Sequence, residues 1–155
     1  METEERYINK GEWLSVALKR QGYPLIPSNV IIDKTVTGLG ITHMEVHSPR
    51  PSIIIEPNVP VIIGKAEGKA NRLAVYELCT KPMIREFLQR KDLKHKKLIT
   101  TPEGFKKIKE VAEALGIDIF KEYFCLFDEC EKIIDYLKNK RTAPMIKGYK
   151  EREHF

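Results

Sequence analysis

Short apolar runs recur along the chain, separated by segments in which apolar residues return at helical spacing. Four runs have the length and the β-branched content that are typical of buried strands, namely residues 52–56, 73–77, 97–100 and 123–127. A fifth run, at residues 29–32, follows a proline-rich connector that favours extended backbone. We therefore predict five buried strands.

Helix signals lie between these runs. Thr101 can cap a helix whose apolar residues share one face, and Gly116 follows its last turn, so we predict a helix over residues 102–115. In the same way, Thr80 predicts a helix over residues 82–90.

The N-terminal segment carries another helix signal. Asn9 and Glu12 have the spacing of a capping box, which predicts a helix over about residues 10–21. Strands that are too apolar to face water, in alternation with helices, favour a mostly parallel sheet covered on both faces. We therefore predict an α/β fold in which residues 1–137 form a single domain and residues 138–155 a basic tail.

Composition narrows the class of protein. The 155 residues are 42% apolar and 32% charged, as in globular proteins, and no apolar run is long enough to cross a membrane. The acidic N-terminus lacks the pattern of a secretory signal, and three cysteines are an odd number for a disulfide framework. A cytoplasmic protein without a membrane partner is the expectation.

Positive charge is concentrated in one stretch. Residues 81–109 hold ten lysines or arginines and three acidic residues, so the stretch carries +7 while the whole chain carries +5. Such a segment favours a nucleic-acid partner, because lysine and arginine neutralise phosphates. The alternative is a solvated helix face.

A glycine-rich turn follows the predicted strand at 29–32. Thr37, Gly38, Gly40 and Thr42 form the pattern T-G-x-G-x-T, in which backbone amides can surround a phosphate. An ordinary glycine turn is an equally good interpretation of this pattern alone.

An acidic pair follows the run at 123–127. Asp128 would lie at the edge of the sheet, where it could hold Mg²⁺ through water, and Glu129 beside it could act as the catalytic base that deprotonates an attacking water. The alternative is the first turn of a helix, where acidic residues are favourable.

These two patterns resemble those of P-loop NTPases, and specifically the first RecA-like lobe of superfamily 2 helicases of the DEAD/DExx type. The acidic pair resembles Walker B, and the turn resembles a degenerate Walker A loop in which Ile41 takes the place of the usual lysine. Lys34 is the residue expected to replace this lysine near the γ-phosphate. The resemblance implies a RecA-like three-layer sandwich and a Mg-ATP site, with phosphate bound by Thr37, Gly38, Gly40 and Thr42, and Mg²⁺ by Thr42 and Asp128.

Two more segments resemble helicase motifs that bind the sugar-phosphate backbone of a nucleic acid. The strand and turn ending in Pro57 and Asn58 resemble motif Ia, and the turn at Thr101 and Pro102 resembles motif Ib. The resemblance implies that these four residues, with Lys106 and Lys107, bind a strand of DNA or RNA.

The resemblance spans residues 21–131 and implies an ATP-binding, helicase-like lobe. Hydrolysis is expected to be weak or to depend on a second RecA-like lobe or protein partner that supplies an arginine finger. One alternative is a non-catalytic adaptor that binds nucleic acid or protein, and another is an unrelated flavodoxin-like or nucleotide-modifying α/β protein. His43 and His47, four residues apart, are expected to be packing or exposed groups rather than metal ligands.

Overall fold

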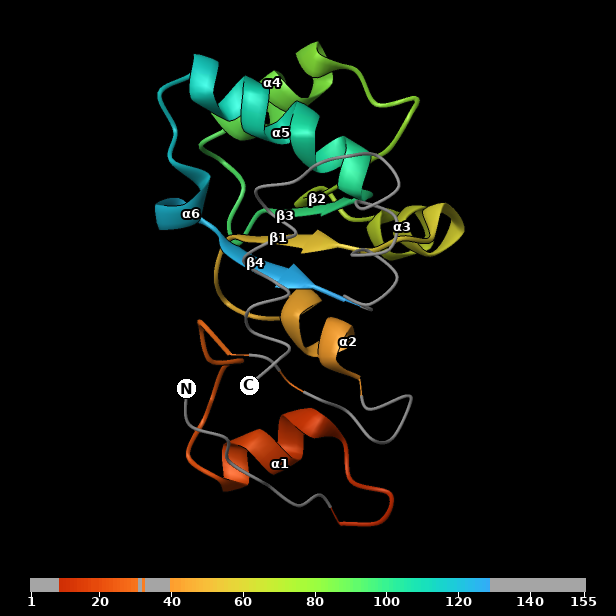
Figure 1. Ribbon diagram of the computed structural model, residues 1–155, viewed down its shortest axis with the longest axis vertical. Helices are drawn as coiled ribbons and strands as arrows, with labels where there is room; N and C mark the ends of the chain where they lie inside the picture. The colour runs from red at the N-terminus through yellow and green to blue at the C-terminus, as the bar shows by residue number, and fades with distance from the viewer. Residues whose placement is uncertain (1–8, 31, 33–39, 129–155) are drawn as a thin grey trace, which may run out of the picture. The chain divides into compact units, whose positions relative to one another are not determined.

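The computed structural model describes residues 9–30, 32 and 40–128 (Figure 1). The chain divides into two compact units, one of residues 1–48 with 134–155 and the other of residues 49–133. The first unit contributes two short helices, and the second contains the sheet. The single domain expected over residues 1–137 stays a prediction, and the basic tail at 138–155 lies outside the described residues.

A four-stranded parallel sheet forms the centre of the second unit, in the order β2-β3-β1-β4. Its core consists of fully buried side chains of β1 and β3, among them Ile53, Ile54, Leu98 and Ile99. The α/β class and four predicted strands are therefore confirmed. The strands are β1 (Ser52–Ile55), β2 (Arg72–Val75), β3 (Lys97–Thr100) and β4 (Phe124–Phe127).

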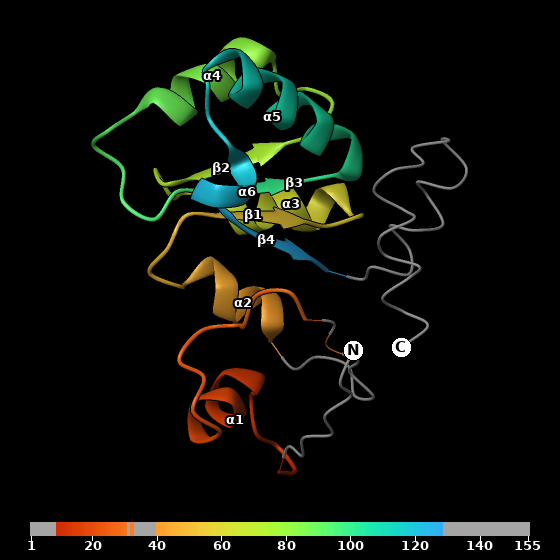
Figure 2. The ribbon, with the colours of Figure 1, turned by 60° about the vertical axis from the view of Figure 1, so that its left-hand side comes forward.

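Four helices connect these strands: α3 (Val59–Ala66), α4 (Lys81–Gln89), α5 (Pro102–Ala114) and α6 (Ile119–Glu122). Along the strand order, the chain moves from β1 to β2 in one direction. It then moves from β2 to β3, and from β3 to β4, in the opposite direction. Because such connections are right-handed, α3 belongs on one face and α4 with α5 on the other. Figures 1 and 2 show α4 and α5 side by side. No helix within the described part of the chain is long and apolar enough to cross a membrane.

The two predicted helices of this unit are confirmed together with their caps. The Thr101 hydroxyl accepts a hydrogen bond from the amide of Gly104 at 3.0 Å, and Gly116 adopts a φ of +73° just after α5. The Thr80 hydroxyl accepts a hydrogen bond from the Met83 amide at the start of α4 in the same way. These local signals fixed the helix ends because each of them satisfies a terminal backbone group.

Helix α1 (Leu14–Arg20) begins four residues later than the predicted helix over about 10–21. Gly11 has a φ of +78°, which is outside the helical region. The amide of Glu12 therefore donates to the Asn9 carbonyl in a separate turn at 3.0 Å. The expected capping box does not form, although the Glu12 carboxylate accepts a hydrogen bond from Arg20 at 3.0 Å.

The predicted strand over residues 29–32 is wrong for the three residues that the structure describes. Residues 29, 30 and 32 are in no strand, Asn29 has a φ of +59°, and the side chain of Val30 is 48% exposed. Apolar and β-branched composition alone could not distinguish this exposed connector from a buried strand. The argument that placed the glycine turn after the first strand of the sheet therefore fails.

Candidate functional site

Three of the predicted motifs meet at the carboxyl edge of the sheet. The amide of Glu56, just after β1, donates to the carbonyl of Thr100 on β3 at 2.8 Å. On the other side of β1, the amide of Asp128 donates to the carbonyl of Ile55 at 2.9 Å. The segments that resemble motifs Ib, Ia and Walker B thus lie next to one another, in the order β3, β1, β4 (Figure 1).

The turns after β1 and β3 each lead into a helix. Asn58 is the N-terminal cap residue of α3, and it is exposed with no capping hydrogen bond from its side chain. Thr101 caps α5 and is 9% exposed, and Pro102 is also buried. The exposed side chains of these two turns therefore come from Asn58 and from the first turns of α5, including Lys106.

A second carboxylate accompanies Asp128 at this edge. Glu56 and Asp128 each come one residue past the paired residues Ile55 and Phe127, so the register makes them neighbours on adjacent strands. Glu56 is only 4% exposed, and its carboxylate lies 3.6 Å from the ammonium of Lys65. The sequence did not single out Glu56, although its place after an apolar run is the same signal that selected Asp128.

Carboxylates are suitable ligands for Mg²⁺, and Asp128 and Glu56 are therefore of the right type. Among residues 9–30, 32 and 40–128, however, no group of three or more acidic, histidine or cysteine side chains is arranged to hold a metal ion. Glu129 lies outside the described residues. These two carboxylates would supply part of a Mg²⁺ site and not the whole of it.

Lys107 has a structural role that the sequence did not suggest. Its ammonium donates to the carbonyl oxygens of Tyr76 at 3.2 Å, Glu77 at 3.3 Å and Cys79 at 3.0 Å. These bonds join α5 to the loop between β2 and α4. A contact between Lys107 and nucleic acid, as the resemblance implies, would have to compete with these bonds.

Replacing Lys107 with methionine is expected to lower the free energy of unfolding by about 1 to 3 kcal/mol, because three carbonyl oxygens lose a charged donor. Lys109→Met is the matched control, since Lys109 is exposed on the same helix and should change stability by less than about 0.5 kcal/mol. Urea unfolding of both variants would measure the difference. Equal stability of the two would show that the Lys107 bonds contribute little.

The remaining basic residues of the stretch at 81–109 do not form one continuous surface. The loop between α4 and β3, with Lys91 and Lys94, lies at the amino edge of the sheet, opposite the predicted motifs. Lys97 is fully buried, and its ammonium donates to the Arg50 carbonyl at 2.6 Å. The positive charge beside the motif Ib turn is therefore smaller than the total charge of the stretch at 81–109 suggested.

Several of these cations also have partners within the second unit. Lys81 pairs with Glu110 at 2.5 Å, and Lys96 donates to the Leu88 carbonyl at 2.8 Å. Lys106 is exposed on α5 and lies closest in sequence to the motif Ib turn. Among the exposed lysines, Lys106 is therefore the main candidate for a phosphate contact at this turn.

The phosphate-binding residues expected from the glycine turn are only partly described. Gly40 has a φ of +77° and precedes α2 (Ile41–Val46), and a β-carbon on Gly40 would come within 3.1 Å of the Trp13 ring. Thr42 is 7% exposed, and Ile41 is also buried. Lys34, Thr37 and Gly38 lie outside the described residues, so the phosphate loop stays a prediction.

The described cysteines are free thiols, as the odd number suggested. Burial raises the pKa of the Cys125 thiol to about 11, and it also raises the pKa of Cys79 despite the nearby charge of Lys107. Both thiols are therefore protonated at neutral pH, which is typical of structural rather than reactive cysteines. Cys130 lies outside the described residues.

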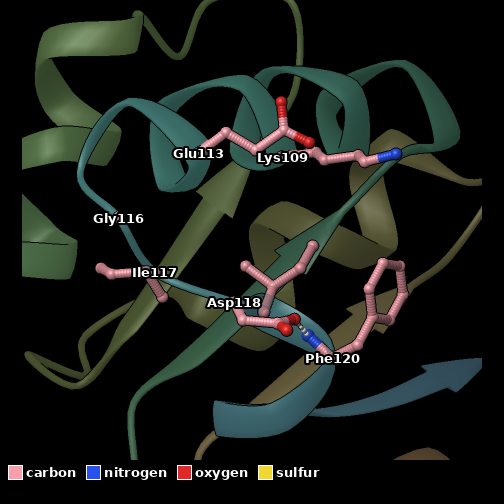
Figure 3. A pocket seen from close by; sticks show the side chains of 7 residues that line it. Lys109, Glu113, Gly116, Ile117, Asp118 and Phe120 are labelled. Carbon is pink, nitrogen blue, oxygen red and sulfur yellow. Dashed lines mark hydrogen bonds between the residues drawn. The ribbon is translucent and has the colours of Figure 1, made fainter.

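A shallow hollow of about 390 Å³ lies at the C-terminal end of α5 (Figure 3). Helix α5 starts at the carboxyl edge of the sheet, so its last turn lies away from that edge. Asp118 in this hollow accepts a hydrogen bond from the amide of Phe120 at 3.1 Å and so caps α6. Of the residues in the predicted basic stretch only Lys109 lines it, and no residue of the predicted motifs does, so the hollow is separate from the candidate site.

Comparison of the chain with protein-family models, with curated proteins and with solved structures found no match.

Proposed function

We propose that the chain is a helicase-like lobe that binds Mg-ATP and a strand of nucleic acid. The observation that supports this proposal is the order of segments at the carboxyl edge of the sheet. Hydrogen bonds from Glu56 to β3 and from Asp128 to β1 bring three motif-like segments together, although they are distant in sequence. The carboxyl edge is also where open parallel sheets bind their ligands.

Nucleic acid would contact the turns after β1 and β3. Asn58 offers an exposed amide side chain, and the N-terminus of the thirteen-residue helix α5 offers a favourable dipole to a phosphate. Lys106 adds positive charge one turn into α5. Pro57, Thr101 and Pro102 would shape these turns, because Thr101 already uses its hydroxyl as a cap.

For the nucleotide, Asp128 would hold Mg²⁺ through water, and ATP would supply phosphate oxygens to the same ion. Glu129 would be the base, as the resemblance implies. Thr37, Gly38, Gly40 and Thr42 would contact phosphate, with Thr42 also a ligand of Mg²⁺ and Lys34 in place of the missing lysine. Turnover would need the positive charge of a second lobe or partner.

A second candidate function, a non-catalytic adaptor, is favoured by a different observation. Ile41, at the position where the resemblance requires a lysine, is 7% exposed and belongs to the core. Thr101 and Pro102 are buried as well. An adaptor would keep this fold and bind nucleic acid or protein without using ATP.

Titration with a fluorescent ATP analogue, with and without Mg²⁺, distinguishes the two functions. We expect the full chain to bind the analogue more tightly by at least tenfold when Mg²⁺ is present, because the ion bridges Asp128 and the phosphates. Binding that is absent, or that does not respond to Mg²⁺, would favour the adaptor.

Nucleic-acid binding is tested with a single-stranded oligonucleotide over a range of salt concentrations. Affinity should fall as salt rises, and Lys106→Gln should reduce the slope of log K against log salt by about one. Lys91→Gln is the matched control, because Lys91 is exposed at the opposite edge of the sheet and should leave the slope unchanged. Equal effects of the two changes would indicate nonspecific attraction and not a site at the motif Ib turn.

A further inference from the structure

Helix α2 places two imidazoles on the same side of its last turn. His43 lies within the helix, and His47 is the residue that caps its C-terminal end. The ring centroids are 4.2 Å apart, and the ring planes are inclined by 34°. Both side chains are exposed. The pair was expected to consist of packing or exposed groups, and its geometry now supports a more specific role.

The hydrogen bond of His47 determines which of its nitrogens is available. Its Nδ1 lies 2.8 Å from the carbonyl oxygen of His43, and a carbonyl oxygen only accepts. Nδ1 is therefore the donor in this hydrogen bond, and in the neutral imidazole Nε2 has the lone pair. Metal-binding histidines commonly have this arrangement, in which one ring nitrogen donates to a carbonyl and the other binds the ion.

The separation of the rings suits a shared ion. Two nitrogens bound to one ion at about 2.0–2.1 Å lie roughly 3 to 3.5 Å apart. Rings whose centroids are 4.2 Å apart can bring two nitrogens to this separation when the exposed His43 side chain changes its rotamer. Imidazole is a preferred ligand of zinc, nickel and copper ions, whereas Mg²⁺ and Ca²⁺ prefer oxygen.

We propose that His43 and His47 form a binding site for a divalent transition-metal ion on α2. Within the described ranges no cluster of three or more candidate ligand side chains occurs. The two imidazoles are the protein ligands that we assign, and water would complete the coordination. An ion held in this way joins positions four residues apart and stabilises the short helix that follows the glycine turn. The proposal does not rest on the proposed Mg-ATP and nucleic-acid functions, although His43 directly follows Thr42 in the chain.

Isothermal titration of the full chain with Ni²⁺ at neutral pH, in a buffer that does not chelate metals, tests this proposal. We expect one high-affinity equivalent, which His43→Gln and His47→Gln each weaken by at least tenfold. The double variant should be no weaker than the single variants, because removal of either imidazole already destroys the chelate. His95→Gln is the matched control, since His95 is exposed in the loop before β3 and lies in the other unit.

Thermal unfolding gives a second measurement that does not depend on the titration. Ni²⁺ should raise the Tm of the wild-type chain and of His95→Gln, and it should leave the Tm of His43→Gln and His47→Gln unchanged. The Tm values without metal show whether the variants fold. Equal Ni²⁺ affinity in all four proteins, or additive losses in the double variant, would overturn the proposal.

Discussion

Replacing Gly104 with alanine is expected to lower the free energy of unfolding by about 2 to 4 kcal/mol. A β-carbon at this position would lie 2.3 Å from the Thr100 hydroxyl oxygen and 2.5 Å from the Val75 carbonyl oxygen. The second of these atoms belongs to the backbone of β2, where it also accepts a hydrogen bond from the amide of Thr101 at 3.2 Å. Relief of the clash therefore requires α5 to move away from the sheet.

Gly64→Ala provides the matched control for this change. Gly64 is also helical, but a β-carbon there has no neighbouring atom within 4 Å. Alanine should stabilise α3 by about 0.5 to 1 kcal/mol, because it restricts the unfolded chain and favours the helix. Urea unfolding would measure both variants. If both changed stability in the same direction, close contact between α5 and the sheet at Gly104 would be contradicted.

The second large effect is expected at the acidic pair. Glu129→Gln should lower the rate of ATP turnover by about 10² to 10⁴, because an amide cannot accept the proton of the attacking water. The Kd of Mg-ATP should change little, since glutamine has nearly the same size and Asp128 is kept. Turnover would be measured at saturating Mg-ATP with a nucleic-acid strand present, and Kd by titration.

Asp128→Asn separates binding of the ion from proton transfer. It should remove the dependence of nucleotide binding on Mg²⁺ as well as turnover, whereas Glu129→Gln should preserve that dependence. Unchanged turnover in Glu129→Gln would remove this residue from the mechanism. If the wild type does not turn over ATP, and its affinity for nucleotide does not depend on Mg²⁺, the adaptor is the better interpretation.

Much of the second unit could be predicted because its signals are local. The strands at 52–55 and 97–100 are fully buried around short apolar runs. The hydroxyls of Thr101 and Thr80 accept hydrogen bonds from amides in the first turns of α5 and α4. The run at 29–32 had a similar composition, but Val30 is 48% exposed, and exposure depends on the rest of the fold. Short apolar runs lack the periodicity that would separate these two cases.

For the candidate site, only the placement of its segments at one edge of the sheet could be predicted. Because the strands are parallel, the backbone alone places Asn58, Thr101 and Asp128 at the same edge of the sheet, irrespective of side-chain conformation. Lys107 illustrates the limit, because its sequence neighbours suggested a phosphate contact while its ammonium binds three carbonyls of a loop about thirty residues earlier. Which partner a long flexible side chain selects is determined by tertiary packing.

Strand β1, one of the two interior strands of the sheet, is made before either of its neighbours. During synthesis β1 emerges first, but its partners β3 and β4 end at residues 100 and 127. A nascent chain therefore carries an unpaired row of isoleucines until Thr100 has been added, and β1 has a second partner only after Phe127. Truncation between these points would leave an apolar edge open to pairing with another chain, so fragments of this length should aggregate more readily than the full protein.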